Sequence, residues 1–381
     1  MVKKADVVII GGGVTGLSTA YQLAKLGVSD VVVVERDLIA SGSTPLAAGG
    51  IRQQFSTEAN IRIMLESVKV FERFSEQFDT EIDFRQWGYL FLATTEEDWK
   101  AFQENVPLQK SLGVPVTLLL PEEIKEIAPY LYLDDVIGGT FCPTDGYADP
   151  YSIAMGFAKK ARELGVKIHE KTEVVDVKVE GGRVRGVVTN KGQISTPVVV
   201  NAAGAWAAQI GRMVGVELPI LPYRRQIFVT APFDELPERI PMVIDFAPSF
   251  YFRREGPGIL MGMSDKEEPS SFNTNADWDF LTKMVEKAVH RAPALERAGF
   301  KDSWGGLYAI TPDDNPILGP VPGVEGFICA AGFSGHGVMQ SPAIGRLIAE
   351  LITGRETFVD LTPFRFERFA EGKLTKEARV I

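Results

Sequence analysis

The chain is poor in cysteine and histidine. Among its 381 residues are two cysteines, Cys142 and Cys329, and three histidines, His169, His290 and His336. The cysteines lie far apart and form no CxxC pair, which argues against a disulfide framework. The histidines lack the spacing of metal ligands. We therefore predict no metal site and a reducing compartment, the cytoplasm.

Basic charge and long apolar runs are also missing. The formal net charge of −10 argues against nucleic acid or an anionic membrane surface as a partner. No apolar run is long enough to cross a bilayer, and the first predicted strand begins too early to leave room for a signal peptide. The 45% of hydrophobic residues excludes global disorder. We expect a soluble protein, large enough for two domains, with no membrane span.

Glycine is abundant, and the first glycines lie in a βαβ pattern. The apolar run Val7–Ile10 is short and rich in β-branched residues, which predicts a buried parallel strand. Apolar residues then recur at helical spacing from Leu17 until Gly27. A second apolar run, Val31–Val34, ends at an acidic residue. The order of strand, glycines, helix, strand and acid is typical of a dinucleotide-binding unit.

The turn of this unit reads Gly11-x-Gly13-x-x-Gly16. Gly11 permits the tight turn, Gly13 lets the backbone approach a pyrophosphate, and Gly16 lets the helix pack closely. The N–H groups that open the helix favour phosphate, and Glu35 is placed to accept hydrogen bonds from an adenosine ribose. An ordinary βα turn is the minor alternative. The unit predicts a dinucleotide without saying which one.

A second glycine-rich turn, Gly332–Gly337, favours a flavin over NAD. It follows the apolar stretch VEGFICAAG and opens a final helix, roughly Gly337 to Ile352. A reduced flavin carries negative charge near N1, which a helix N-terminus stabilises. The stretch VVVNAAGAW adds another strand that breaks into a close-packed turn, although a plain β-turn-α connection is an equal alternative for it. We expect Gly11 and Gly337 to converge on one FAD.

The pattern of elements predicts two interleaved domains. We predict an α/β chain, α+β overall, in which a Rossmann-like FAD-binding domain is interleaved with a mainly antiparallel β-sheet substrate domain. Residues 1–85, 145–220 and 301–381 are assigned to the FAD-binding domain, and residues 86–144 and 221–300 to the substrate-binding domain. The main predicted helices are 59–78, 96–112, 150–164 and 277–292, and the antiparallel strands are 226–230, 242–245, 249–253 and 258–263.

Several motifs together resemble the FAD-dependent amine and amino-acid oxidoreductases of the D-amino-acid oxidase superfamily. They are VVIIGGGVTGLSTAYQLA with VVVVER, SGSTPLAAGGIRQQF, VVVNAAGAWA, SFYFRREGPGILMG, TPDDNPILGP and AAGFSGHGVMQSPAIG. The last is the most specific, and the similarity spans essentially the whole chain. In pattern the chain is most similar to the sarcosine oxidase β-subunit, glycine oxidase and the β-subunit of L-proline dehydrogenase.

The resemblance implies non-covalent FAD, because Gly306 stands where monomeric sarcosine oxidases tether the flavin through a cysteine. The residues expected to hold FAD come from the first βαβ unit, the loop after it, the middle of the chain and the last turn. They are Gly11, Gly13, Val14, Thr15, Gly16, Glu35, Arg36, Ser43, Thr44, Ala48, Gly49, Gly50, Arg52, Val174, Ala202, Ala203, Gly204, Trp206, Gly306, Gly332, Phe333, Gly335, His336, Gly337, Val338 and Met339.

The resemblance also implies hydride transfer to flavin N5 from the carbon next to nitrogen of a small amino acid, giving an imine. A secondary or N-methylated substrate such as L-proline, sarcosine or glycine is expected. The implied catalytic-site residues are Arg52, Tyr251, His336 and Met339. Arg52 would bind the substrate carboxylate and Tyr251 would donate its hydroxyl to it, with a surface ion pair and core packing as the alternatives. His336 is expected to tune the flavin, and Met339 replaces a carboxylate-binding lysine.

Other roles stay open in the sequence. Arg225 and Arg253 are weaker candidates for carboxylate binding, and Asp313 is read as part of a turn. Leu260 aligns with a lysine that is thought to help oxygen react, which favours a dehydrogenase that passes electrons to a second subunit or another acceptor. FMN at a subunit interface is left open. The alternatives are a flavoprotein hydroxylase or reductase with a nicotinamide donor, and an electron-transfer subunit of a heteromeric complex.

Overall fold

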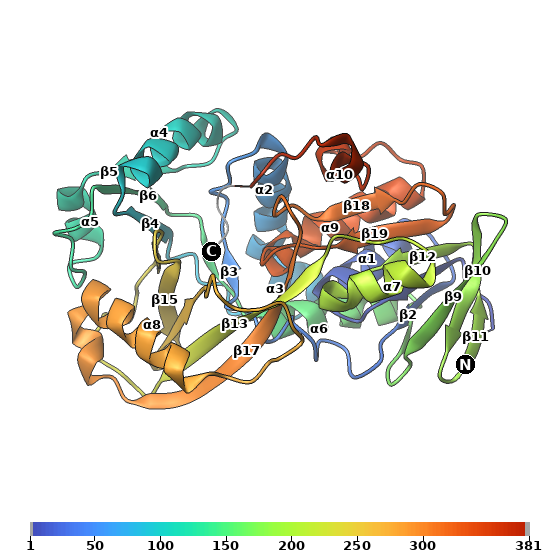
Figure 1. Ribbon diagram of the computed structural model, residues 1–381, viewed down its shortest axis with the longest axis horizontal. Coiled ribbons are helices and arrows are strands. Elements are labelled where there is room, and N and C mark those ends of the chain that lie inside the picture. Colours follow the sequence, from blue (N-terminus) through green and yellow to red (C-terminus); the bar gives the residue numbers. More distant parts are fainter. Residues whose placement is uncertain (1–2, 378–381) are drawn as a thin grey trace.

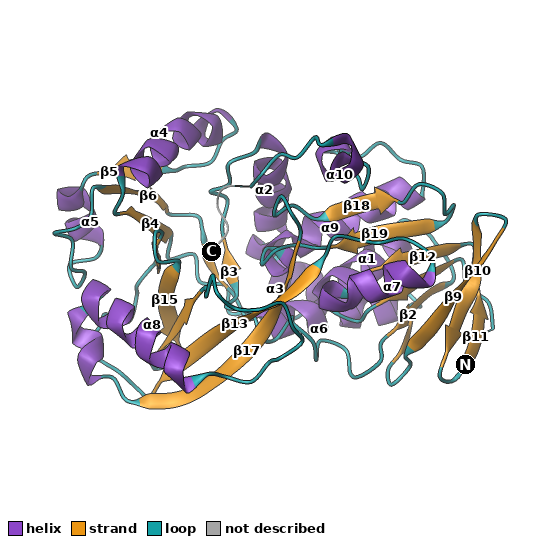
Figure 2. Cartoon of the chain, viewed as in Figure 1, coloured by secondary structure: helices purple, strands orange, loops and turns teal. Residues whose placement is uncertain are grey.

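The computed structural model describes residues 3–377, and two large β-sheets organise this part of the chain (Figure 1). Figure 2 shows helices gathered around one sheet and a second group of helices at the outer side of the other. Two smaller sheets complete the strands of the described residues.

The first large sheet has six strands in the order β18-β19-β12-β1-β2-β8. Every neighbouring pair is parallel except β18 with β19. The strands are β1 (Val7–Ile10), β2 (Val31–Val34), β8 (Lys167–His169), β12 (Val198–Asn201), β18 (Ile317–Pro320) and β19 (Phe327–Ala331). The central strands β1 and β2 are buried along their whole length, because helices cover the faces of a parallel sheet.

Two helices that lie far apart in sequence pack together on this sheet. They are α1 (Val14–Lys25) and α9 (Gly337–Ile352). A Cβ added at Gly345 of α9 would lie 2.2 Å from Ser18 Oγ of α1, so the close approach of the helices requires glycine there. The other helices of this half are α2 (Glu58–Glu72), α3 (Phe74–Phe78), α6 (Pro150–Glu163), α7 (Ala207–Met213) and α10 (Arg368–Glu371).

The second large sheet has eight strands in the order β17-β13-β16-β15-β14-β4-β6-β5. Only the pairing of β14 with β4 is parallel. The strands are β4 (Tyr89–Ala93), β5 (Thr117–Leu119), β6 (Gly138–Cys142), β13 (Leu221–Thr230), β14 (Met242–Asp245), β15 (Phe250–Glu255), β16 (Gly258–Met263) and β17 (Phe300–Ile310). Its helices are α4 (Glu96–Ser111), α5 (Pro121–Ile127) and α8 (Trp278–Arg291).

The two small sheets lie beside the large ones in the fold. A three-stranded sheet contains β9 (Val174–Glu180), β10 (Arg183–Thr189) and β11 (Gly192–Ser195). A two-stranded sheet pairs β3 (Gly50–Ile51) with β7 (Gly146–Tyr147). Short 3-10 helices cover Gly204–Trp206, Pro293–Arg297 and Thr362–Phe364.

The predicted fold class is confirmed: the chain is mixed α/β, with one mainly parallel and one mainly antiparallel sheet. The predicted domain boundaries stay a prediction. One strand runs past them, because β17 begins at Phe300 and pairs with β13 in the antiparallel sheet. The single helix predicted over 59–78 is wrong. Arg73, with φ −117° and ψ 20°, divides it into α2 and α3.

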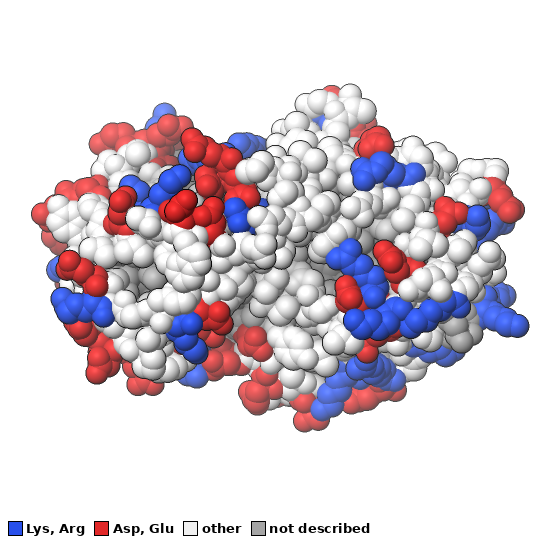
Figure 3. All heavy atoms as spheres, turned by 60° about the horizontal axis from the view of Figure 1, so that its bottom comes forward, with Lys and Arg blue, Asp and Glu red and all other residues white. Residues whose placement is uncertain are grey.

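Side chains of both charges lie on the molecular face drawn in Figure 3, and Lys and Arg side chains gather toward its right-hand side. Within residues 3–377, no helix combines the length and the apolar character that a membrane crossing needs.

Candidate active site

A cavity of about 490 Å³ lies at the carboxyl ends of the parallel strands. Its wall includes Ile10 at the end of β1, Val34 at the end of β2, and Ala202 directly after β12. Phe333, two residues after β19, also lines it. Ligands of open α/β sheets bind outside the carboxyl ends of the strands, so this cavity lies where a dinucleotide is expected.

The first glycine turn lies at the cavity, and its backbone is packed so closely that Gly11 and Gly16 leave no space for a Cβ atom. Gly11 has φ +111°, and a Cβ there would lie 2.4 Å from the carbonyl oxygen of Ala202. A Cβ at Gly16 would lie 2.0 Å from the carbonyl oxygen of Gly11, so Gly16 serves the packing of α1 on the turn. Gly13 precedes α1, and a Cβ there would meet only Thr44 Oγ1 within 4 Å, at 3.3 Å. The backbone at Gly13 is therefore open to a ligand.

Glu35 is held at the end of β2 by two backbone N–H groups. Gly12 N donates to Glu35 Oε2 at 2.8 Å, and Asp37 N donates to Oε1 at 2.9 Å. Glu35 lines the cavity, and its carboxylate oxygens have further lone pairs for ribose hydroxyls.

The second glycine turn opens onto the same cavity. Gly335 has φ +99°, and a Cβ there would lie 2.4 Å from the Tyr308 ring. Gly337 is the first residue of α9, so the positive end of this long helix faces the cavity. The turns at Gly11 and Gly337, which lie at opposite ends of the chain, therefore meet in one place.

Most of the residues predicted for the cofactor line the cavity. They are Gly11, Gly13, Val14, Thr15, Glu35, Arg36, Ser43, Thr44, Ala48, Val174, Ala202, Ala203, Gly204, Trp206, Gly306, Phe333, Gly335, Gly337 and Val338, and Tyr251 joins them from the catalytic set. The predicted residues outside its wall are Gly16, Gly49, Gly50, Arg52, Gly332, His336 and Met339.

Arg52 and His336 form a buried pair behind this wall. Arg52 is 2% exposed and donates from Nη1 to the carbonyl oxygen of Gln54 at 2.7 Å. Its Nη2 lies 3.1 Å from His336 Nε2. Arginine can only donate, so Nε2 accepts and the ring proton lies on Nδ1. Burial lowers the pKa of Arg52, and the Phe55 ring, 4.1 Å from its guanidinium carbon, covers it.

Three buried or half-buried phenols surround this region. Tyr251 and Tyr308 line the cavity, and Tyr89 is buried on β4. Burial raises the pKa of all three hydroxyls, so they stay protonated and can donate hydrogen bonds. The charges of Arg225 and Arg52 both act on Tyr308.

Arg225 is a cation in the wall of the cavity. Its Nη1 donates to the carbonyl oxygen of Arg224 at 2.9 Å, and its guanidinium carbon lies 5.3 Å from the centre of the Tyr308 ring. The buried Nε has no hydrogen-bond partner among the described residues. Arg253, the other alternative, is bound to the Ala48 carbonyl and to Glu255, which leaves Arg225 as the better anion-binding candidate of the two.

The family of the chain follows from its sequence. The family model described as DAO, FAD dependent oxidoreductase, matches residues 6–351. The chain belongs to this family. The resemblance read from its motifs is therefore confirmed, and the oxidoreductase can be compared with its relatives.

Two curated relatives are about one third identical to this oxidoreductase over the aligned residues. FAD-dependent oxidoreductase domain-containing protein 1 of Xenopus laevis is 36% identical, over 96% of this chain and 83% of its own length. Dimethylglycine dehydrogenase of Rattus norvegicus is 32% identical over 98% of this chain, but the match covers only 46% of that protein. The chain thus spans about half the length of this second relative.

Among solved structures, L-proline dehydrogenase from P. horikoshii superposes with a TM-score of 0.93. It is 40% identical, and the alignment covers 98% of this chain and all of the other.

The cavity of the oxidoreductase fits FAD. Two glycine turns, two helix N-termini and Glu35 suit a pyrophosphate and a ribose. Neither cysteine nor histidine occurs among the described residues of its wall, and both Cys142 and Cys329 are buried elsewhere as free thiols. This lining suits FAD that is held without a covalent bond. In residues 3–377 no group of three or more metal-ligating side chains comes together.

Two parts of the site escaped the sequence analysis. Tyr308 and Tyr89 carry no motif, and only the pairing of their strands brings them near Arg52. Asp145 is fully buried behind the IRQQF segment, where its carboxylate accepts from Gln53 N at 2.8 Å and from Gln54 Nε2 at 3.1 Å. Burial raises its pKa to about 6. A buried carboxylate between two Gln side chains leaves no pattern in the sequence that identifies it.

Proposed function

We propose that this oxidoreductase dehydrogenates a small secondary or N-methylated amino acid, such as L-proline or sarcosine, at the carbon next to nitrogen. Bound FAD would supply the hydride acceptor, and the product would be an imine. The observation that carries the proposal is the cation Arg225, which lines the cavity beside the phenols of Tyr251 and Tyr308. Relatives named for proline and dimethylglycine dehydrogenation support it.

The charges along the cavity divide it into two ends. The other charged wall residues, Glu35, Arg36, Asp37 and Glu173, lie beside β2 and β9, at the end where the adenosine binds. Arg225 lies opposite Gly306 in the sheet, away from that end. A cation with phenol donors suits the carboxylate of an amino acid, and Arg52 adds a second positive charge close behind.

The chain's residues bind and orient the substrate in this mechanism. The guanidinium group of Arg225 and the hydroxyls of Tyr251 and Tyr308 hold the carboxylate, which fixes the neighbouring carbon in a dry pocket. None of the wall residues near Arg225 is a carboxylate or an imidazole that could act as a base, as far as residues 3–377 are concerned. The amine therefore reacts in its neutral form.

The test of the reaction is anaerobic bleaching of the purified holoenzyme by glycine, sarcosine, L-proline, D-proline and D-alanine. We expect L-proline or sarcosine to bleach the flavin. Bleaching by NADH without any amine would instead support a nicotinamide-dependent reductase. Failure of every amino acid would support an electron-transfer subunit and contradict the proposal.

The carboxylate role predicts a selective loss in an Arg225→Met variant. Loss of a charged hydrogen bond should weaken binding of tetrahydrofuran-2-carboxylate, a proline analogue without nitrogen, by roughly ten- to a hundredfold. The dissociation constant is measured from the flavin absorbance. Arg239 is exposed and does not line the cavity, so Arg239→Met is the matched control. Unchanged affinity in the Arg225 variant would refute the role.

We further propose that electrons leave to a partner subunit or another acceptor in the cytoplasm, as in a dehydrogenase. Met339 and Leu260 stand where lysines are expected in oxidases, and both are buried. Exposure of the bleached flavin to air tests this point, because rapid reoxidation would indicate an oxidase.

A second cavity, of about 280 Å³, supports the proposal of an additional FMN at a subunit interface. Its wall contains the aromatic side chains of Trp87, Tyr147 and Trp304, together with three cations and four acids: Arg85, Arg253, Arg254, Asp83, Asp149, Glu238 and Glu255. The aromatic side chains suit a flat ring, and to bind a phosphate Arg85 and Arg253 would have to release Asp83 and Glu255. Ala47 lies in the walls of both cavities, so a thin segment separates them. Chromatography of the flavins extracted from the chain purified with its partner tests this; absence of FMN contradicts it.

A further inference from the structure

The segment between β16 and α8, residues 264–277, reaches from the antiparallel sheet to the FAD cavity. Phe272 of this segment stacks on Trp206, with ring centres 5.4 Å apart and an angle of 21° between the planes. Trp206 belongs to the short helix after β12, on the side of the parallel sheet. Phe272, Trp206 and Thr274 all line the FAD cavity. The ring pair therefore joins the two halves of the molecule across the cavity wall.

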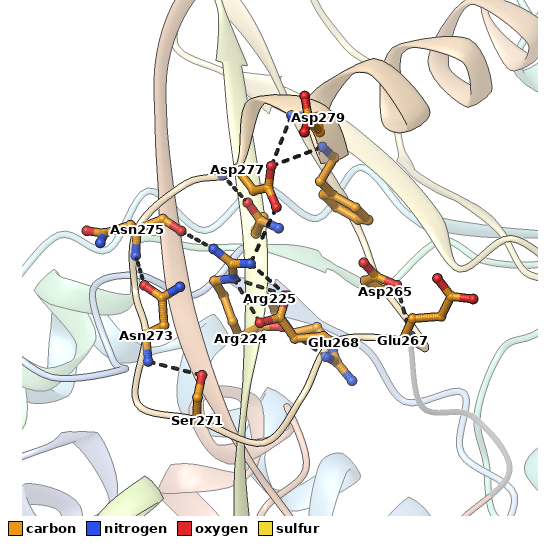
Figure 4. A network of polar contacts seen from close by, with 12 residues as sticks. Arg224, Arg225, Asp265, Glu267, Glu268, Ser271, Asn273, Asn275, Asp277 and Asp279 are labelled. Carbon is orange, nitrogen blue, oxygen red and sulfur yellow. Dashed lines mark hydrogen bonds and ion pairs between the residues drawn. The ribbon is translucent and has the colours of Figure 1, made fainter.

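A buried arginine holds the base of this segment. Arg224 of β13 donates from Nη2 to Glu268 Oε2 at 2.9 Å and from Nη1 to the carbonyl oxygen of Asn275 at 2.6 Å. The side chains of Arg224 and Glu268 are 10% and 5% exposed. Figure 4 shows the guanidinium between Glu268 and Asn275, with Asp277 close by. One side chain thus fixes both ends of the loop that carries Phe272.

Backbone contacts hold the same loop against the sheet. Ser271 N donates to the carbonyl oxygen of Pro222 at 3.0 Å, and Gly305 N donates to that of Thr274 at 3.0 Å. At the tip, Trp206 is the only aromatic ring that Phe272 contacts within residues 3–377, and the Trp206 ring also lies 3.8 Å from the guanidinium carbon of Arg36. Several hydrogen bonds and an ion pair therefore hold the base of the loop, whereas its tip is held by the stacking of Phe272 on Trp206.

We propose that residues 268–275 form a cofactor clasp, which retains FAD through the Phe272–Trp206 stack and sets the rate at which FAD leaves. The clasp crosses the cavity wall beside Arg36 and Gly204, which belong to the FAD-binding side. FAD cannot pass this part of the wall until Phe272 separates from Trp206. The inference rests on FAD binding by the family and does not depend on the identity of the amino acid.

The test is the rate of FAD release from the diluted holoenzyme, followed by the rise of free-flavin fluorescence. A Phe272→Ala variant loses the stack and should release FAD roughly two- to twelvefold faster, the range expected for an aromatic pair. Phe272 is 43% exposed, so the substitution leaves the core intact. Phe272→Tyr keeps the ring and should restore slow release. A wild-type rate in Phe272→Ala would overturn the proposal.

A matched pair elsewhere on the molecule provides the control. Phe300 is 49% exposed and packs on Trp278 at 4.9 Å, outside both cavities. Phe300→Ala should leave the release rate unchanged. A Glu268→Gln variant, which removes the charge that Arg224 binds, should speed release while Phe272 is still present. Equal acceleration by Phe300→Ala would show a general loosening of the fold and would refute a specific clasp.

Discussion

Asp145 shows at the scale of one residue how burial alone changes a carboxyl group. It has no cation within hydrogen-bond distance among the described residues, and amide groups of Gln53 and Gln54 surround it. These donors favour the charged form, but burial outweighs them and raises the pKa to about 6. Because Asp145 binds Gln53 and Gln54, which follow Arg52, its protonation changes the hydrogen bonds that hold this segment.

This shift predicts a pH-dependent stability. The folded pKa lies above the ordinary value of about 3.9, so the folded protein holds this proton more tightly than the unfolded chain. Protonation then stabilises the fold by about 1 kcal/mol as the pH falls from 7 to 5. The free energy of unfolding of the wild type, relative to Asp145→Asn, should rise by this amount in urea titrations. A difference that stays flat over this range would contradict the raised pKa.

At the scale of elements, the first turn and α1 fit together only because Gly16 has no side chain. A methyl group there would lie 2.0 Å from the Gly11 carbonyl oxygen, which is backbone and cannot rotate away. We expect Gly16→Ala to push α1 off the turn, to cost about 1–3 kcal/mol in stability and to lower the FAD content.

The FAD-to-protein absorbance ratio after purification measures this effect. Gly299→Ala is the control, because its Cβ would lie 3.4 Å from the Ala231 Cβ, at ordinary contact distance and outside both cavities. Full FAD content in Gly16→Ala would argue against the tight packing.

Elements with strong local patterns could be predicted, whereas elements made by pairing could not. The apolar runs of β1 and β2, and the strands β14 and β16, are found at their predicted residues. β17 was missed because its first residues are exposed and Gly305 and Gly306 interrupt its pattern. It is a strand because it pairs with β13 along almost its whole length, and a single sequence does not reveal that contact.

The same contrast holds for the site. The glycines of the first and last turns follow a spacing that is typical of cofactor binding. Their position in the cavity wall could therefore be predicted from the sequence. Arg52 is buried as expected for a functional arginine, but it binds His336 and lies behind the wall. Arg225 lines the cavity because side chains alternate along β13: Arg224 is directed to Glu268 and Arg225 to the opposite face.

At the scale of the whole molecule, a buried ion pair joins α10 to the turn between β17 and β18. Arg368 of α10 donates to both oxygens of Asp313, at 2.7 and 2.9 Å, and the two side chains are 1% and 0% exposed. Asp313 thus has a structural role in its turn. Removing one partner leaves a buried charge uncompensated.

We expect Asp313→Ala to destabilise the protein by about 3–5 kcal/mol, because Arg368 would stay buried without its carboxylate. Thermal and urea unfolding measure the loss. The exposed pair of Arg365 with Glu371, 3.6 Å apart, is the control, and Glu371→Gln should change stability by less than about 1 kcal/mol. Similar losses in both variants would refute the importance of burial.

The packing of α9 on α1 has a consequence for biosynthesis. A ribosome makes the first glycine turn long before the helix that completes the flavin cradle, which begins only at Gly337. Until then β12 lacks β19, and the small residues of α1 that receive Gly345 stay uncovered. The complete cradle for FAD therefore forms only after Gly337 and the helix that it opens have emerged. Until then, the uncovered face of α1 and the unpaired edge of β12 are exposed to aggregation.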